Sequence, residues 1–273
     1  MTIMIMPAPA DAPPEGSLRA LISQAVPLIG RQLIVWTREP VTMLQSILMP
    51  ALSMVMLKVV LGDSIELATG QNSAYRTVPM IVLIGSMFGS MVAGIRLNNE
   101  RATGLLSRLY VMPISRGADL TARIVSELIR IIITTCVLLA VGSLIGFRFP
   151  NGIWTVLPII AVAFMYAVAF AMMVLAVSVS TRPGVTLVPY LSLLSSVMMF
   201  FNTGFVPLEM YPEWLQPIVK YQPMSPAVET MKSLSLGGPV TEHFILVVIW
   251  SVVILGLSIY PALRGYHKAA SGR

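Results

Sequence analysis

Long apolar runs constrain this 273-residue chain more than any other feature of its sequence. A helix needs about 20 residues to cross a bilayer core of about 30 Å. Six runs of this size are present, at residues 42–61, 78–97, 122–146, 153–179, 185–206 and 243–263. Only 11% of the residues are charged, which is too few to cover a water-facing surface. We therefore predict an all-α integral membrane protein with six transmembrane helices.

The distribution of basic residues predicts how these spans are oriented. An even number of spans places both termini on one side, together with the loops at 98–121 and 180–184. Most Arg and Lys residues fall on that side, and the opposite side holds only Arg76, Arg148, Lys220 and Lys232. Because basic loops favour the cytoplasm, we expect two cytoplasmic termini in the inner (plasma) membrane of the cell. The net charge of +6 then reports orientation, and we expect no binding to nucleic acid.

An amphipathic helix is predicted before the first span, at residues 17–40. Its apolar side chains recur at helical spacing, at Leu18, Leu21, Ile22, Ala25, Ile29, Leu33 and Trp36. Such a helix fits the cytoplasmic membrane interface, and Pro40 ends it. A helix packed on a partner domain is the alternative.

The remaining segments complete the predicted domain organisation. Residues 1–16 are rich in Pro and Ala and predict a disordered tail. Residues 41–268 form the six-span domain, and residues 269–273 a cytoplasmic tail. Within the second span, Gly85, Gly89 and Ala93 lie four apart, which favours close helix packing inside the subunit or across a dimer.

The spans contain few groups that could perform chemistry. Glu127 and Arg130, three apart, can pair on one helix face, either as a structural ion pair or as part of a gate. With Cys136 as the one cysteine and two histidines at span ends, we predict no metal site, no catalytic residue and no enzymatic activity. The chain has no Gly-Lys pair and hence no Walker A loop, so ATP and Mg²⁺ would be bound by another polypeptide.

Charged residues return between the second and third spans, in NNERATGLLSRLYVMP at 98–113. A helix there would place Leu105, Leu106, Leu109 and Tyr110 on one face, with Glu100, Arg101 and Arg108 facing outward. Such a helix fits either a groove on a soluble partner or the lipid headgroups.

The run ERATGLLSRLYVMPISRGADL resembles the segment between the second and third spans of ABC-2 type exporter permeases. The matching positions are Glu100, Arg101, Gly104, Leu105, Leu109, Pro113, Ser115 and Arg116. In that family the segment is the coupling helix that inserts into the ATP-binding cassette subunit. The resemblance implies that residues 100–113 relay closure of the ATPase to the spans.

A second resemblance to this family covers FFNTGFVPLEMYPEWLQPIVKYQPMSPAVETMKSLSLGGP, between the fifth and sixth spans. The matching positions are Gly204, Pro207, Pro212, Trp214, Pro223 and Ala227. It implies an external re-entrant or surface pair of short helices, and Tyr211, Trp214 and Tyr221 suit a membrane–water boundary.

The phrases IGFRF, FFNTGFVPL, YPEWLQP and LGGPV narrow the resemblance to the daunorubicin-resistance (Drr-like) permeases, which include subunits of the phthiocerol dimycocerosate lipid exporter. The resemblance implies a permease subunit that works with ATP-binding cassette ATPases and a second permease, identical or paralogous. We expect export of a lipid or hydrophobic compound, in contact with membrane lipid. A drug efflux permease is the first alternative, followed by a polysaccharide exporter and a membrane scaffold that transports nothing.

Overall fold

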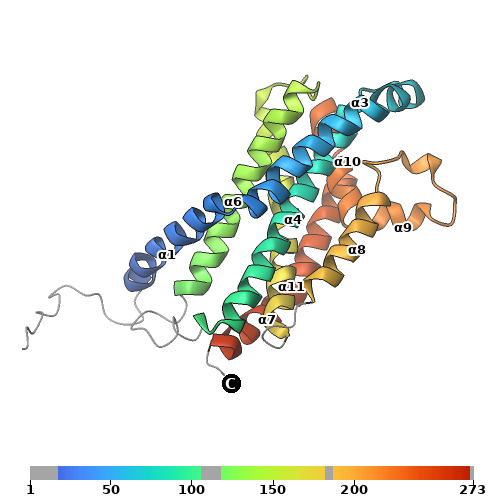
Figure 1. Cartoon of the computed structure of the whole chain (residues 1–273). Coiled ribbons are helices and arrows are strands. Elements are labelled where there is room, and N and C mark those ends of the chain that lie inside the picture. The colour runs from blue at the N-terminus through green and yellow to red at the C-terminus, as the bar shows by residue number, and fades with distance from the viewer. Residues whose placement is uncertain (1–17, 106–117, 182–186, 271–273) are drawn as a thin grey trace, which may run out of the picture.

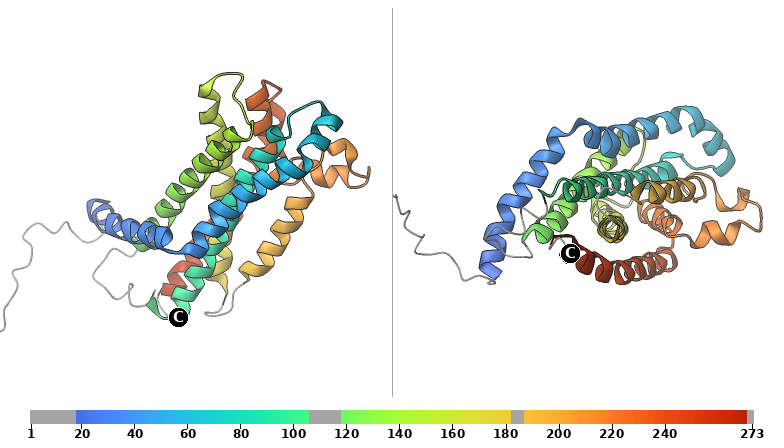
Figure 2. Two further views of the ribbon diagram at one scale, coloured as in Figure 1. Left: turned by 45° about the horizontal axis from the view of Figure 1, so that its top comes forward. Right: turned by 60° about the horizontal axis from the view of Figure 1, so that its bottom comes forward.

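The structure, a computed structural model, describes residues 18–105, 118–181 and 187–270. Within these ranges every regular element is helical, which confirms the all-α prediction. The long helices run side by side in an elongated bundle, and α1 projects from its flank (Figures 1 and 2).

The helices of ten residues or more are α1 (Leu18–Arg38), α3 (Met49–Thr69), α4 (Ala74–Ala102), α6 (Ala118–Leu144), α7 (Val156–Ser180), α8 (Val188–Phe200), α10 (Met224–Leu236) and α11 (Thr241–Ala270). The shorter helical elements are α2 (Pro40–Met43), the π-helical turn η1 (Leu44–Leu48), η2 (Ile153–Thr155), η3 (Leu208–Met210) and α9 (Gln216–Tyr221). Two of the longer helices end in a left-handed glycine, Gly70 after α3 and Gly237 after α10, a common helix stop because glycine has no Cβ to clash.

Five helical segments in the described ranges are long and apolar enough to cross a membrane, at Pro40–Leu67, Ala74–Ala102, Ala118–Leu144, Ile153–Ser180 and Thr241–Tyr266. The fifth predicted span, at 185–206, differs from this expectation. Its helix α8 has 13 residues, about 20 Å at 1.5 Å per residue. It ends where the Asn202 side chain accepts hydrogen bonds from the backbone N–H groups of Gly204 and Phe205, at 2.7 and 3.1 Å. The described part of the bundle therefore has five full-length candidate spans and one shorter apolar helix.

Helix α4 forms the centre of the bundle. In its most apolar stretch 78% of the residues are buried, against 17% for the outer spans formed by α3 and α11. Helices α3, α6, α7, α8 and α10 all contact α4. The apolar outer faces of α3 and α11 are left for lipid or another membrane subunit.

Helix α1 ends at Arg38, and Pro40 begins the next helix after an extended Glu39, as predicted. It packs against α6, where Ala25 and Trp36 are buried, while Ile22 is 61% exposed. The apolar stripe is thus divided between the bundle and an outward face.

Glycines on α4 allow this central packing. A Cβ placed on Gly85 would lie 2.7 Å from a Leu138 methyl carbon of α6, and one on Gly94 would lie 2.4 Å from Val174 of α7. These close approaches occur within one chain.

Candidate functional site

The end of the bundle that the sequence predicts to be cytoplasmic carries a cluster of ion pairs. Glu100, near the C-terminus of α4, accepts a hydrogen bond of 2.5 Å from Arg123 of α6. Its other carboxylate oxygen lies 3.8 Å from Arg31 of α1. Because Glu100 and Arg123 are largely shielded from solvent, this pair is screened less than a surface pair. One carboxylate therefore ties α4 to both α1 and α6.

Arg101 fixes the same end of α4 to α7. Its guanidinium donates hydrogen bonds to the carbonyl oxygens of Ser178 and Thr181, at 2.6 and 2.9 Å. These carbonyls belong to the C-terminal end of α7, where helical carbonyl groups lack intrahelical partners and the helix dipole favours a cation.

The outward orientation expected for Glu100 and Arg101 is therefore wrong. Both side chains turn back onto the bundle, where Glu100 pairs with Arg123 and Arg101 donates to carbonyl oxygens at the end of α7. Gly104 has a positive φ of 72° and ends the α4 segment just before Leu105. Leu109 and Pro113 of the predicted coupling helix lie outside the described residues.

Asp119 and Tyr266, which the sequence analysis did not identify, extend the cluster. Arg123 donates to Asp119 at 2.8 Å, and Tyr266 of α11 donates its hydroxyl to the same carboxylate. Asp119 and Arg123 are four residues apart on helix α6, so this ion pair could have been predicted from the sequence. Tyr266 is 147 positions away from Asp119 and has no such local signal. With it, the ion-paired cluster connects α1, α4, α6, α7 and α11.

Glu127 and Arg130 form the predicted pair on α6, with Arg130 Nε donating to Glu127 at 3.0 Å. Ser90 of α4 joins them: its hydroxyl lies 2.6 Å from Glu127 and 3.1 Å from an Arg130 nitrogen. Arg130 lies over Gly89, where an added Cβ would come within 1.7 Å of its Nη1 atom. The Glu127–Arg130 pair therefore joins α6 to α4 through Ser90.

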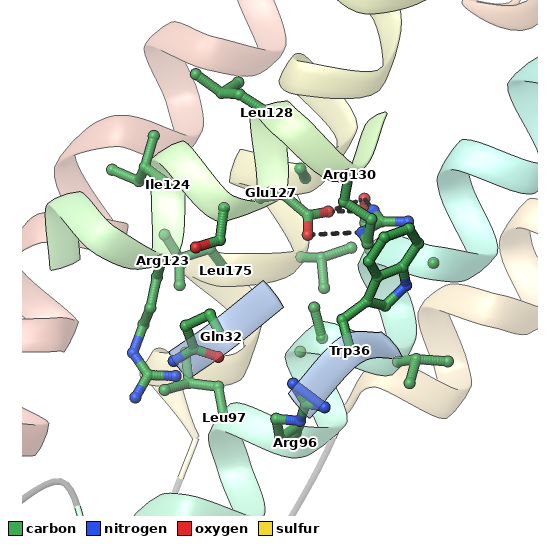
Figure 3. Close-up of a pocket in the computed structure, with 18 of the residues that line it drawn as sticks. Gln32, Trp36, Arg96, Leu97, Arg123, Ile124, Glu127, Leu128, Arg130 and Leu175 are labelled. Carbon is green, nitrogen blue, oxygen red and sulfur yellow. Dashed lines mark hydrogen bonds and ion pairs between the residues drawn. The ribbon is translucent and has the colours of Figure 1, made fainter. Parts of the chain in front are cut away.

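A cavity of about 120 Å³ lies beside this pair, between α1, α4, α6 and α7. Figure 3 shows Glu127 joined to Arg130, with Trp36 pointing toward the guanidinium from α1. Arg96 of α4 also lines the cavity and pairs with Glu39. Ala93, the third small residue of the predicted stripe, lines it too.

A larger groove of about 800 Å³ lies between α3, α4 and α8. Its walls are mostly aliphatic, methionine and phenylalanine side chains, and its polar side chains are Gln45, Ser53 and Ser192. A groove of this size and character accommodates a drug-sized apolar molecule or part of a lipid.

The segment from Gly204 to Pro223 lies at the opposite end of the bundle from the ion-paired cluster (Figure 1). Gly204 is tightly packed, since a Cβ there would lie 2.8 Å from Met80. Pro207 precedes η3, Pro223 precedes α10, and the Pro212 carbonyl accepts a backbone hydrogen bond of 2.8 Å from Leu215.

Burial differs between this segment and helix α10, which follows it. Trp214 is 73% exposed, which suits an interfacial ring. Helix α10 is instead buried against α4, α7 and α11. The segment around Trp214 therefore lies at the surface, and the helix that follows it packs inside the bundle.

Long apolar spans, an apolar groove and one ion-paired end define a polytopic helical membrane protein. Among the described residues, no group of three or more His, Cys, Asp and Glu side chains could hold a metal ion.

Comparison with known proteins specifies the class further. The family model for the ABC-2 type transporter matches residues 23–236. The chain is 36% identical over 257 residues to the probable doxorubicin resistance ABC transporter permease protein DrrC of Mycobacterium tuberculosis (strain ATCC 25618 / H37Rv), covering 94% of this chain and 93% of the relative. It is 22% identical over 218 residues to the daunorubicin resistance ABC transporter permease protein DrrB1 of Streptomyces coeruleorubidus, covering 79% and 76%. It is 24% identical over 242 residues to a putative transport permease, ycf38, of Pyropia yezoensis, covering 87% and 82%.

The chain therefore belongs to the ABC-2 type transporter family and is a Drr-like permease, as the sequence resemblance predicted.

Proposed function

We propose that this chain is the membrane-embedded subunit of an ATP-binding cassette exporter that moves a lipid or other hydrophobic compound out of the cytoplasmic leaflet. The observation that supports a hydrophobic cargo is the groove between α3, α4 and α8. Its volume of about 800 Å³ and its apolar lining match a large, weakly polar molecule, because burial of apolar surface drives such binding.

Drug efflux fits the groove equally well. Relatives with which the chain aligns over most of its length are named for resistance to doxorubicin and daunorubicin. A polysaccharide fits less well, because a sugar chain needs a run of hydrogen-bonding side chains and the groove offers only Gln45, Ser53 and Ser192. A scaffold that transports nothing would have no need of an ATPase.

Energy for transport would come from a partner ATPase that binds ATP and Mg²⁺. We assign contact with that subunit to residues 100–113. The linkage of Glu100 and Arg101 to α1, α6 and α7 supports this role, since movement at the end of α4 would reach three other helices. A second permease, identical or paralogous, would complete the pathway.

The Glu127–Arg130 pair has a structural role in this proposal. Arg130 is 5% exposed in its side chain, and separating such a pair leaves a buried charge without its partner. A gating role would require the pair to open during each cycle.

A matched pair of substitutions on α8 tests the cargo groove. Ser192 lines the groove, whereas its neighbour Leu193 is exposed on the outside of the helix. We expect Ser192→Phe to reduce cargo-stimulated ATP hydrolysis several-fold by filling the groove, and Leu193→Phe to leave it unchanged.

The measurement uses the permease reconstituted with its ATPase in lipid vesicles, with doxorubicin and an ester lipid as alternative cargoes. Stimulation by one of them identifies the cargo class. Equal behaviour of the two variants would remove the groove from the pathway, and failure to form a complex with any ATPase would favour a scaffold.

A further inference from the structure

The 120 Å³ cavity beside the Glu127–Arg130 pair contains unused hydrogen-bond donors. The indole N–H of Trp36, Nη1 of Arg130 and Nε of Arg96 are buried and have no hydrogen-bond partner within the described residues. Trp36 is only 7% exposed and Arg130 only 4%, so bulk water does not satisfy them. Buried donors without partners are rare in folded proteins, because leaving them unpaired costs free energy.

The Gln32 amide also lines the cavity, but it brings two N–H donors of its own beside its one oxygen acceptor, so the described wall has fewer free acceptors than donors. The Glu127 carboxylate is already engaged, with Ser90 on one oxygen and Arg130 on both. The Ser126 hydroxyl also lines the cavity and has no hydrogen-bond partner among the described residues, and a hydroxyl can donate as well. The cavity therefore presents a surplus of donors, and its complement is a molecule that brings an oxygen acceptor.

The guanidinium groups that line the cavity already have carboxylate partners. Among the described residues, each guanidinium on the cavity wall, from Arg96, Arg123 and Arg130, is paired with at least one carboxylate, from Glu39, Glu100, Asp119 or Glu127. A phosphate or carboxylate would add a negative charge with no counterion, which is costly at a buried position. An uncharged acceptor, such as a carbonyl oxygen, avoids that cost.

The remaining wall is apolar and includes Leu33, Ile124 and Leu175. A volume of 120 Å³ equals about four water molecules at roughly 30 Å³ each, enough for one ester group with a few methylene groups. Helix α1 forms one side, and its pattern predicts a place at the membrane interface, the boundary between headgroups and acyl chains. Lipid ester groups lie at this boundary.

We propose that this cavity is a binding site for the carboxylic ester carbonyl of an uncharged lipid, with the Trp36 and Arg130 N–H groups and the Ser126 hydroxyl as donors. The site does not depend on the proposed transport function, since a lipid bound there need not be the cargo.

Photocrosslinking of the full-length chain tests the site without any ATPase. The chain is placed in nanodiscs of diether phosphatidylcholine, so that the bilayer supplies no ester carbonyl. Three probes carry the same diazirine: a diacylglycerol, the matching dialkylglycerol ether, and a phosphatidic acid with ether-linked chains. We expect the diacylglycerol to label peptides that line the cavity, such as those containing Leu33 and Ile124, and the ether to label them several-fold less.

Two conservative substitutions connect the labelling to the donors. Trp36→Phe removes the indole N–H and retains most of the ring, and Ser126→Ala removes the hydroxyl. We expect each to reduce diacylglycerol labelling of the cavity several-fold. Trp250→Phe is the matched control, because its indole donates elsewhere, to the Tyr221 carbonyl at 2.8 Å, and it should leave the labelling unchanged.

Three results would overturn the proposal. Equal labelling by ester and ether would show that the carbonyl is not recognised. Stronger labelling by the phosphatidic acid would assign the donors to an anion. Absence of labelling at the cavity with all three probes would mean that water alone occupies it.

Discussion

At the scale of single residues, Gly89 is a position where a side chain has no room. An added Cβ would lie 1.7 Å from Nη1 and 2.6 Å from Cζ of Arg130. We expect Gly89→Ala to push the guanidinium away from Ser90 and Glu127 and to lower the free energy of unfolding by about 1–3 kcal/mol, the usual range for overpacking. Denaturant unfolding of the purified protein in mixed micelles measures this change.

Gly256 of α11 supplies the control, since a Cβ there meets nothing within 4 Å. Because alanine has the higher helix propensity, Gly256→Ala should leave stability unchanged or raise it slightly. Equal stability of the Gly89→Ala protein and the wild type would show that Arg130 relocates at no cost.

Residue pairs could be predicted from the sequence only when they share a helical turn. The Glu127–Arg130 pair is three apart and was predicted. Arg101, in contrast, meets carbonyls 77 and 80 positions away. The sequence predicts that Arg101 faces outward, because a charged residue between two apolar spans is usually hydrated by water.

At the scale of elements, apolar run length predicted the long helices and misjudged α8. The run at 185–206 is apolar throughout its middle, yet α8 ends at Phe200, where Asn202 turns the chain with its side chain. Hydropathy averages over a window and does not register one capping side chain. Hydropathy also did not predict the burial of α10, because this burial comes from packing against α4, α7 and α11.

The end of α4 supports a prediction about coupling. Gly104 adopts a φ of 72°, a conformation that costs other L-residues about 1–2 kcal/mol. Gly104→Ala should therefore redirect the chain after α4 and reduce the permease-dependent stimulation of the partner ATPase, with membrane insertion intact. Replacing Glu100 should have the same effect, because it releases α4 from Arg123 and Arg31.

Gly104→Asn is the matched control, since asparagine tolerates the left-handed region better than alanine. It should retain most of the stimulation. ATP hydrolysis by the reconstituted complex, measured with and without permease, checks both variants, and normal coupling in Gly104→Ala and the Glu100 variant would refute the assigned role.

At the scale of the whole molecule, the ion-paired cluster and the segment from Gly204 to Pro223 lie at opposite ends of the bundle (Figure 1). The charge bias predicts which end faces the cytoplasm. Exposed sites at the two ends, Thr103 and Glu209, can carry a reporter cysteine once the native Cys136 is replaced by alanine. A membrane-impermeant maleimide added to intact cells should label Glu209→Cys and leave Thr103→Cys unlabelled until the membrane is permeabilised. The reverse pattern would place residues 100–113 outside the cell, where no ATPase could reach them, and would remove the basis for ATP-driven coupling through that segment.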